Sequence, residues 1–220
     1  MSDADLDWTP LKLGADVVQM LLPHRRPFLF VDGTIAVALG PRPALRAVKL
    51  VSANEPVFEG HFPGLSLWPG VYTIEGLGQA INLLDVIVVA AQALERSGLP
   101  PGALVEALRA IDARARLGSR GPTELEKRLI DGLGDPRSRV GYAGAIDVKL
   151  LEPVFAGATI EYRVVRTREL ANAKRYDVEA RVGDRPVARG TLSNAMLAMP
   201  ASGMPASGTP ASETPSGPAG

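Results

Sequence analysis

The spacing of apolar side chains predicts a helix followed by two strands near the start of the chain. Apolar residues recur at helical intervals over residues 11–22, and Pro23 ends this pattern. Residues 28–39 and 45–51 are rich in β-forming side chains, and Gly40-Pro41 separates them. This pattern favours two strands joined by a turn.

Residues 71–96 form the longest apolar run and are predicted to be one long helix. Pro69 and Gly70 suit its start, and Gly98 suits its end. The run is long enough to span a membrane, but it contains several polar side chains and no basic residue stands at its start. We therefore interpret it as a buried helix of a globular fold. Because it is apolar nearly all round, other elements must surround it.

Residues 100–139 differ in character and are predicted to be a helical insertion. Two short amphipathic helices fit residues 103–117 and 123–133. Thr123 and Glu126 form a capping-box pattern at the start of the second helix. The segment carries more basic than acidic side chains, which leaves it with a local positive charge.

The pattern returns to strands after the insertion. Apolar and polar side chains alternate along residues 160–165 and 176–182, and Gly183-Asp184 signals a hairpin turn. Residues 199–220 are a low-complexity run of Pro, Ala, Ser and Gly, which we predict to be a disordered tail. The order of elements predicts an α+β fold in which an antiparallel sheet curls around one central helix.

Composition narrows the classes of function. The formal net charge is zero, which argues against bulk nucleic-acid binding. The chain has no cysteine and only two histidines, so it offers no disulfide and little basis for a metal centre. The acidic first five residues lack the apolar core of a secretory signal. We therefore expect a cytoplasmic protein without a membrane span.

The candidate chemistry lies in the segment Glu59-Gly60-His61-Phe62-Pro63-Gly64 and in Glu75. His61 stands among glycine and proline, where helix and strand are both disfavoured. Glu75 is the first charged residue after it and lies in the long apolar run, where a lone carboxylate is costly unless it is paired or functional. An imidazole and a buried carboxyl group that converge would form an acid/base pair.

The ordered motifs around these residues resemble the FabZ-type β-hydroxyacyl-[acyl carrier protein] dehydratases of the hot-dog fold. The resemblance covers about residues 11–100 and 140–197, on either side of the insertion. It rests on segments that follow one another in the family's order: Leu22 to Asp32, Asn54-Glu55-Pro56, Gly60 to Gly64, Pro69-Gly70-Val71, Ile74-Glu75, Gln79-Ala80, Gly144 to Lys149 and Glu152-Pro153-Val154.

The resemblance implies a single hot-dog domain over residues 1–198 that contains the insertion. It implies dehydration of (3R)-3-hydroxyacyl thioesters, delivered by an acyl carrier protein, to trans-2-enoyl thioesters in fatty-acid or polyketide-type biosynthesis. The family places a catalytic histidine at the position of His61 and its acidic partner fourteen residues later, at Glu75. In the family these two residues meet across a dimer interface, so the resemblance also implies a homodimer or a higher oligomer.

Each side chain would have a distinct role in that reaction. Neutral His61 would take a proton from carbon 2, and Glu75, if burial keeps it protonated, would protonate the leaving hydroxyl group. The N–H of Gly70 at a helix start would stabilise the thioester oxygen. Gln79, one turn after Glu75, would orient the carboxyl group. No metal or redox cofactor is needed.

Every assignment has a simpler alternative. His61 would then be a loop histidine bonded to local carbonyl groups, and Glu75 would be a carboxylate paired with an arginine. Gly70 would only start the helix, and Gln79 would only fill a polar gap at a dimer interface. For His24, just after the first helix, a structural hydrogen bond is the favoured interpretation.

Two departures from the family pattern bear on the substrate. Ser66 and Trp68 replace a proline and a methionine close to the histidine, which reshapes the predicted acyl pocket. The candidates for lining this pocket, with a plain core role as the alternative, are Phe62, Leu65, Leu67 and Trp68.

The insertion is the largest departure, because the simple dehydratases have no counterpart to it. Carrier proteins are generally acidic, so basic side chains of the insertion are candidates for a docking surface. The alternative is a solvated helical hairpin with scattered charge. The candidate docking residues are Arg109, Arg114, Arg116 and Arg120.

Two other classes of function remain open from the sequence. Acyl thioesterases share the hot-dog fold, and a non-catalytic subunit would bind an acyl chain or a carrier protein without turnover. The presence of both His61 and Glu75 in their dehydratase context favours the dehydratase over each of these.

Overall fold

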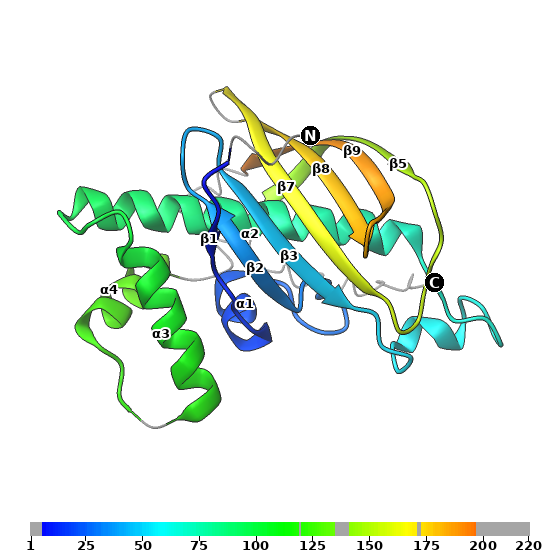
Figure 1. Cartoon of the computed structure of the whole chain (residues 1–220), viewed down its shortest axis with the longest axis horizontal. Helices are drawn as coiled ribbons and strands as arrows, with labels where there is room; N and C mark the ends of the chain where they lie inside the picture. The colour runs from blue at the N-terminus through cyan, green and yellow to red at the C-terminus, as the bar shows by residue number, and fades with distance from the viewer. Residues whose placement is uncertain (1–5, 119, 135–140, 171–172, 197–220) are drawn as a thin grey trace, which may run out of the picture.

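The structure, a computed structural model, describes residues 6–118, 120–134, 141–170 and 173–196. An antiparallel sheet of seven strands lies across one long helix, α2 (Gly70–Arg96), as Figure 1 shows. The strands stand in the order β1 (Thr9–Pro10), β2 (Gly33–Ala38), β3 (Ala44–Leu50), β7 (Thr159–Leu170), β8 (Ala173–Val182), β9 (Arg185–Met196) and β5 (Gly141–Leu150). A second sheet pairs β4 (Leu67–Trp68) with β6 (Val154–Phe155).

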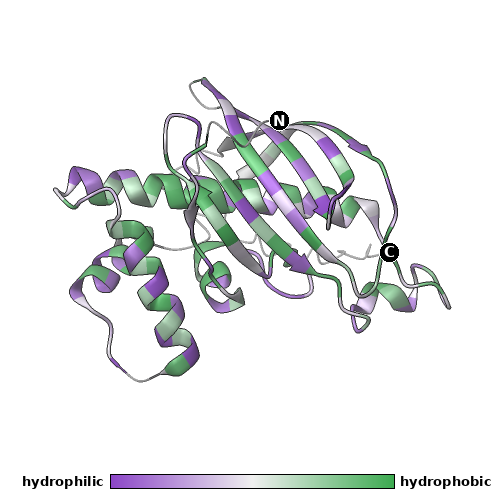
Figure 2. Ribbon diagram, in the orientation of Figure 1, coloured by the Kyte–Doolittle hydropathy of each residue, from purple (hydrophilic) through white to green (hydrophobic). Residues whose placement is uncertain are grey.

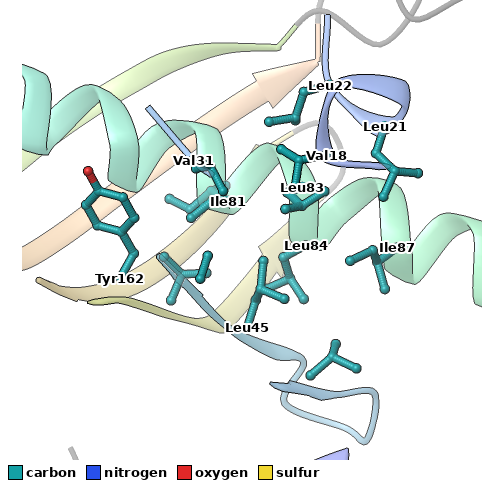
Figure 3. Packing of buried hydrophobic residues seen from close by; sticks show 14 of the residues in the cluster. Val18, Leu21, Leu22, Val31, Leu45, Ile81, Leu83, Leu84, Ile87 and Tyr162 are labelled. Carbon is teal, nitrogen blue, oxygen red and sulfur yellow. The ribbon is translucent and has the colours of Figure 1, made fainter. Parts of the chain in front are cut away.

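The sheet encloses α2 because its inward-facing side chains are apolar. On β7, Ile160, Tyr162 and Val164 are fully buried, whereas Glu161 between them is partly exposed. Figure 3 shows side chains from β3, β7 and α1 (Ala15–Leu21) packed around the middle of α2. A sheet curled around a central helix is the hot-dog fold, and the predicted α+β class is confirmed.

The helix α2 itself matches its prediction, beginning one residue earlier than expected. Figure 2 shows that it is hydrophobic through most of its length. It is long and apolar enough to cross a membrane, but 72% of its most apolar window is buried inside the fold. Such burial is typical of the core helix of a globular protein.

The prediction of a helix over residues 11–22 is only partly correct, because α1 begins at Ala15. Leu11 and Leu13 are buried, but they lie in extended chain beside β2. The N–H of Leu11 donates to the carbonyl of Ile35, and the N–H of Leu13 donates to the hydroxyl of Thr34. The two leucines alternate with polar or small neighbours, and this strand-like period decides their conformation.

The strand predicted over residues 28–39 is also shorter, since β2 covers only Gly33–Ala38. The N–H of Phe30 donates to a side chain of α2, the amide oxygen of Gln79, instead of to a neighbouring strand. The apolar composition of this segment therefore reflects burial against α2. The hairpin predicted at Gly183-Asp184 is confirmed, with Gly183 at a positive φ of 58° between β8 and β9.

The insertion contains the two predicted helices, α3 (Ala103–Leu117) and α4 (Glu124–Leu133). In Figure 1 they lie below the C-terminal end of α2, and α3 packs on both α1 and α2. The hydroxyl of Thr123 accepts a hydrogen bond from the N–H of Glu126, as the capping pattern predicts. Residues 119 and 135–139 of the insertion and the predicted tail, 199–220, lie outside the described residues.

A buried carboxylate joins the two insertion helices. Glu126 is fully buried and ion-paired with Arg114 at 3.0 Å and Arg120 at 2.8 Å. Burial alone would raise the pKa of Glu126, but hydrogen bonds and charges from Arg120 and Arg114 outweigh it and hold the pKa below its usual value. This arrangement fixes α4 to α3.

We expect Gly76→Ala to lower the free energy of unfolding by about 1–3 kcal/mol. An added Cβ would lie 2.2 Å from the hydroxyl oxygen of Tyr162 and 2.4 Å from its Cζ, and this side chain, whose hydroxyl points toward α2 in Figure 3, is fully buried. Urea unfolding measures the change.

Gly132→Ala on α4 is the control for this substitution. Its added Cβ would meet no atom within 4 Å, so we expect a gain of about 0.5–1 kcal/mol from the better helix propensity of alanine. Equal effects at the two glycines would contradict the close approach of α2 to β7.

Candidate active site

The loop before α2 holds His61 in a defined orientation. A short 3₁₀ helix, Pro56–Glu59, precedes it, and the N–H of His61 donates to the carbonyl of Val57 at 2.9 Å. The ring Nδ1 lies 2.9 Å from the carbonyl oxygen of Leu67. Because a carbonyl oxygen only accepts hydrogen bonds, Nδ1 carries the proton and Nε2 of the neutral ring is left as a base.

A cavity of about 470 Å³ opens beside His61. Its walls come from the histidine loop, the start of α2, the segment that joins β5 to β6, and β9. The described residues that line it are His61, Phe62, Leu67, Trp68, Gly70, Thr73, Leu150, Leu151, Glu152, Pro153, Val154 and Val187.

Gly70 is the first residue of α2 and borders this cavity. The first N–H groups of a helix have no partner within the helix and favour negative charge. A Cβ on Gly70 would lie 2.3 Å from Cδ1 of Leu150, so the glycine leaves room for this half-exposed leucine in its present rotamer. Both interpretations of Gly70, as a helix start and as a donor at the cavity, are therefore compatible with its position.

Gln79 is completely buried and ties three groups together. Its Nε2 donates to the carboxylate of Glu75 and to the carbonyl of Phe28, each at 3.0 Å, and its Oε1 accepts from the N–H of Phe30 at 2.8 Å. The amide thus fixes the 28–30 segment to α2 and sets the orientation of the Glu75 carboxylate.

The expected burial of Glu75 does not hold in the single chain, where 34% of its side chain is exposed. Its neighbour is His24, whose Nε2 lies 3.7 Å from the carboxylate, while Nδ1 of His24 is buried without a hydrogen-bond partner. Burial lowers the pKa of His24, the charge of Glu75 opposes this, and the charge of Arg25 adds to it. The structural hydrogen bond predicted for His24 is thus replaced by a contact with Glu75.

His61 and Glu75 face different cavities of the chain. Glu75 borders a smaller one, of about 110 Å³, together with His24, Asn82 and Ile146, and no residue lines both. Both side chains lie in the described part of the structure, which contains no hydrogen bond or ion pair between them. One chain therefore separates the two predicted catalytic groups.

The two cavities are bordered by the free edge of the sheet. β5 is the last strand in the order, so its outer backbone groups have no neighbouring strand in the sheet. Apolar side chains on β5, on the nearby loops and at the start of α2 are about half exposed or more: Phe62, Leu65, Val71, Ile146, Leu150 and Leu151. An unpaired strand edge with exposed apolar side chains is typical of an association surface.

Residues 22–100, which hold both His61 and Glu75, match the family model of the FabA-like domain. This segment of the chain is therefore similar to the FabA-like domain. The matched segment begins just before His24 and ends just after α2, so it contains the histidine loop, Gly70 and Gln79, and it stops where the insertion begins.

Curated proteins that are similar to this chain include 3-hydroxyacyl-[acyl-carrier-protein] dehydratases named FabZ. The protein of Polynucleobacter necessarius is 46% identical over 76 residues, which are 34% of this chain and 50% of that relative. That of Chlamydia trachomatis serovar L2 is 47% identical over 77 residues, 35% of this chain and 50% of the relative. The chain spans about half the length of the curated relatives it matches, and the resemblance to FabZ-type proteins is confirmed over that part.

The likeness to solved structures extends beyond residues 22–100. The dehydratase heterocomplex ApeI:P from Xenorhabdus doucetiae gives a TM-score of 0.50 at 13% identity, and the match covers 81% of this chain and 90% of that chain. A hot-dog-like protein from Thermanaerovibrio acidaminovorans gives a TM-score of 0.39 at 16% identity, over 69% and 78% of the two chains. The first of these likenesses supports the fold.

Three of the four predicted acyl-pocket residues line the His61 cavity, namely Phe62, Leu67 and Trp68. Leu65 does not line it and is half exposed. Trp68 is almost completely buried, and its ring meets those of Phe30, Phe58 and Tyr72 at centroid distances of 5.3–6.3 Å. The tryptophan is thus both a cavity wall and part of an aromatic cluster.

The four arginines proposed for docking all have partners within the chain. Arg114 and Arg120 hold Glu126, Arg116 pairs with Asp112 at 2.7 Å, and Arg109 donates to the carbonyl of Pro10. These contacts give each of the four arginines a structural role within the chain. A docking role for them stays a prediction.

Sequence reasoning missed two kinds of site residue. Thr73 lines the His61 cavity one turn after Gly70, and the helical period that places Gln79 near Glu75 would have found it. Val187 and the contact of His24 with Glu75 depend on how distant segments pack, so no local pattern signals them. In the described part of the chain, no three His, Cys, Asp or Glu side chains are grouped to hold a metal ion.

We expect Gln79→Leu to lower the free energy of unfolding by about 1–3 kcal/mol, because the buried N–H of Phe30 would lose its acceptor. Gln92→Leu, at an exposed position of the same helix, should change it by no more than about 0.5 kcal/mol. Denaturant unfolding measures both. A loss at Gln92 as large as that at Gln79 would show that the buried amide has no special role.

Proposed function

We propose that the chain is a dehydratase of 3-hydroxyacyl thioesters carried on an acyl carrier protein, and that its active site forms between two copies of the chain. The observation that carries this proposal is the base Nε2 of His61, which the contact of Nδ1 with Leu67 holds at the edge of a cavity. His61 lies in the segment that matches the FabA-like domain. The similarity to the FabZ dehydratases supports the same reaction.

The proposed reaction needs one base and one acid. Nε2 of His61 removes the proton from carbon 2 of the substrate, and the electrons of that C–H bond form the double bond to carbon 3. The carbon 3–oxygen bond breaks as Glu75, supplied by the second chain in its protonated form, gives its proton to the departing hydroxyl group. Water and a trans-2-enoyl thioester result, and no electrons are gained or lost overall.

The remaining parts of the site assist this elimination. Negative charge grows on the thioester oxygen as the proton leaves carbon 2, and the N–H of Gly70 at the start of α2 is placed to stabilise it. Gln79 holds the Glu75 carboxyl group in position. A second chain packed over Glu75 would remove it from water, which favours the uncharged form that the reaction needs.

The positions of the two groups support an assembly of two copies. Within one chain His61 and Glu75 face separate cavities, and the β5 edge between those cavities is exposed and apolar. In a two-fold dimer, His61 of each copy would face Glu75 of the other copy, so the dimer would contain two identical sites. We further propose one domain over residues 1–198, a cytoplasmic location and an acidic carrier protein as the substrate-bearing partner.

Mass spectrometry of 3-hydroxyacyl groups on an acyl carrier protein tests the proposal. Wild-type protein should lower the mass of the carrier-bound acyl group by about 18 Da, the mass of the water lost in acid/base elimination. His61→Ala and Glu75→Gln should each lower the rate of this dehydration by about 10²-fold or more. Glu59→Gln, an exposed glutamate of the histidine loop, is the matched control and should retain activity.

Other products would point to the alternative functions. Release of a free thiol from the carrier would identify a thioesterase. Tight binding without any mass change in folded wild-type protein would identify a non-catalytic subunit, and either result would overturn the dehydratase proposal.

A further inference from the structure

A third cavity lies where the insertion meets the central helix, away from both cavities of the proposed active site. It measures about 220 Å³ and lies between the C-terminal half of α2 and the helix α4, with one residue of β8 at its edge. Its lining shares no residue with the cavities of His61 and Glu75. In Figure 1, α4 lies near this end of α2.

The space exists because small side chains face each other across it. Ala90 and Ala93 lie one turn apart on α2, and Gly132 lies on α4 opposite them. A Cβ built on Gly132 would meet no atom within 4 Å. Val89, with 55% of its surface exposed, also lines the cavity and leaves it open to solvent at that side.

One end of the cavity is polar, but its carboxylate is already satisfied. Asp85 is buried and accepts hydrogen bonds from the hydroxyl of Tyr176 at 2.6 Å and from the amide of Asn194 at 3.0 Å. Nζ of Lys174 lies 3.3 Å from the same carboxylate. The Asp85 carboxylate therefore already has hydrogen-bond partners, and the charge of Lys174 offsets its negative charge.

The charged side chains in and beside the cavity leave a positive balance. Lys174 and Arg166 offset Asp85 and Glu169, with which they form a cluster of ion pairs. Arg128, which also lines the cavity, is exposed, and no carboxylate of the described residues forms an ion pair with it. Among the described residues that line the cavity, Arg128 is thus the cationic group left without an ion pair, and most of the remaining lining is apolar.

We propose that this cavity binds a single-chain carboxylate of short to medium length, with the alkyl chain between α2 and α4 and the carboxylate on Arg128. An apolar protein cavity of about 150 Å³ accepts benzene, so a space of about 220 Å³ holds a chain of several methylene groups. Arg128, which has no ion pair with a carboxylate in the described part of the chain, favours an anionic head over a neutral or cationic one. This inference is independent of the proposed catalytic function.

Titration calorimetry of the full chain with butanoate, hexanoate and octanoate tests the apolar part of the site. Each methylene group buried should tighten binding about fourfold until the cavity is full, with one ligand bound per chain. Octanol has the same alkyl chain without the charge, and we expect it to bind more weakly than octanoate.

Two matched pairs of variants locate the ligand. Gly132→Leu fills the cavity and should weaken octanoate binding by about tenfold or more, whereas Asp131→Leu adds the same side chain to α4 outside the cavity and should not. Arg128→Gln should remove the preference of the site for octanoate over octanol. Lys127→Gln, a neighbouring lysine that does not line the cavity, should preserve that preference.

Two outcomes would overturn the proposal: no octanoate binding to folded wild-type protein, or octanoate binding that Gly132→Leu leaves unchanged. In the second case, loss of binding in folded Trp68→Ala would place the alkyl chain in the His61 cavity. Dehydration of carrier-bound substrate by the same preparations is measured separately, so failure of this inference and failure of the proposed function remain distinguishable.

Discussion

The central helix α2 is apolar on nearly every side, so it is stable only where other elements cover it. The sheet covers one side, and α1 and the insertion helices cover others. Each fully buried Leu, Ile or Val of this helix contributes about 1.5–3 kcal/mol to the free energy of folding. The same enclosure gives the polar residues of α2 fixed positions, because a buried polar group is kept only where it has partners.

Three functional features follow from this one helix. Its first residue, Gly70, borders the cavity of His61. Farther along the helix, Glu75 borders a different cavity and accepts a hydrogen bond from Gln79. Farther along, Asp85 and the small side chains Ala90 and Ala93 border the cavity beside α4. The helix thus sets the spacing between the proposed acid, the proposed oxyanion donor and the proposed carboxylate site. The proposed acid and the proposed base are separated within one chain because Glu75 lies on a face of α2 that borders a different cavity from that of His61.

The sequence predicts the features that depend on local pattern. The apolar run of α2, the boundaries of α3, the cap at Thr123 and the hairpin at Gly183 all have strong signals within a few residues. Residues 28–32 lack such a signal, because their backbone is bound by Gln79 from a distant helix. The burial predicted for Glu75 does not hold in the single chain for a related reason. Apolar neighbours along the sequence do not show which face of a helix other elements cover. The internal partners of the insertion arginines likewise depend on packing that sequence spacing does not reveal.

The central claim is that each active site takes His61 from one copy and Glu75 from another, and mixing two inactive variants tests it most directly. Co-expressed His61→Ala and Glu75→Gln chains form mixed dimers with one intact and one doubly altered site. With random pairing, half of the dimers are mixed, so the account predicts about one quarter of the wild-type dehydratase activity. Intact-mass analysis of the dimers verifies that mixing has occurred. No recovery of activity in verified mixed dimers would contradict a site shared between two chains.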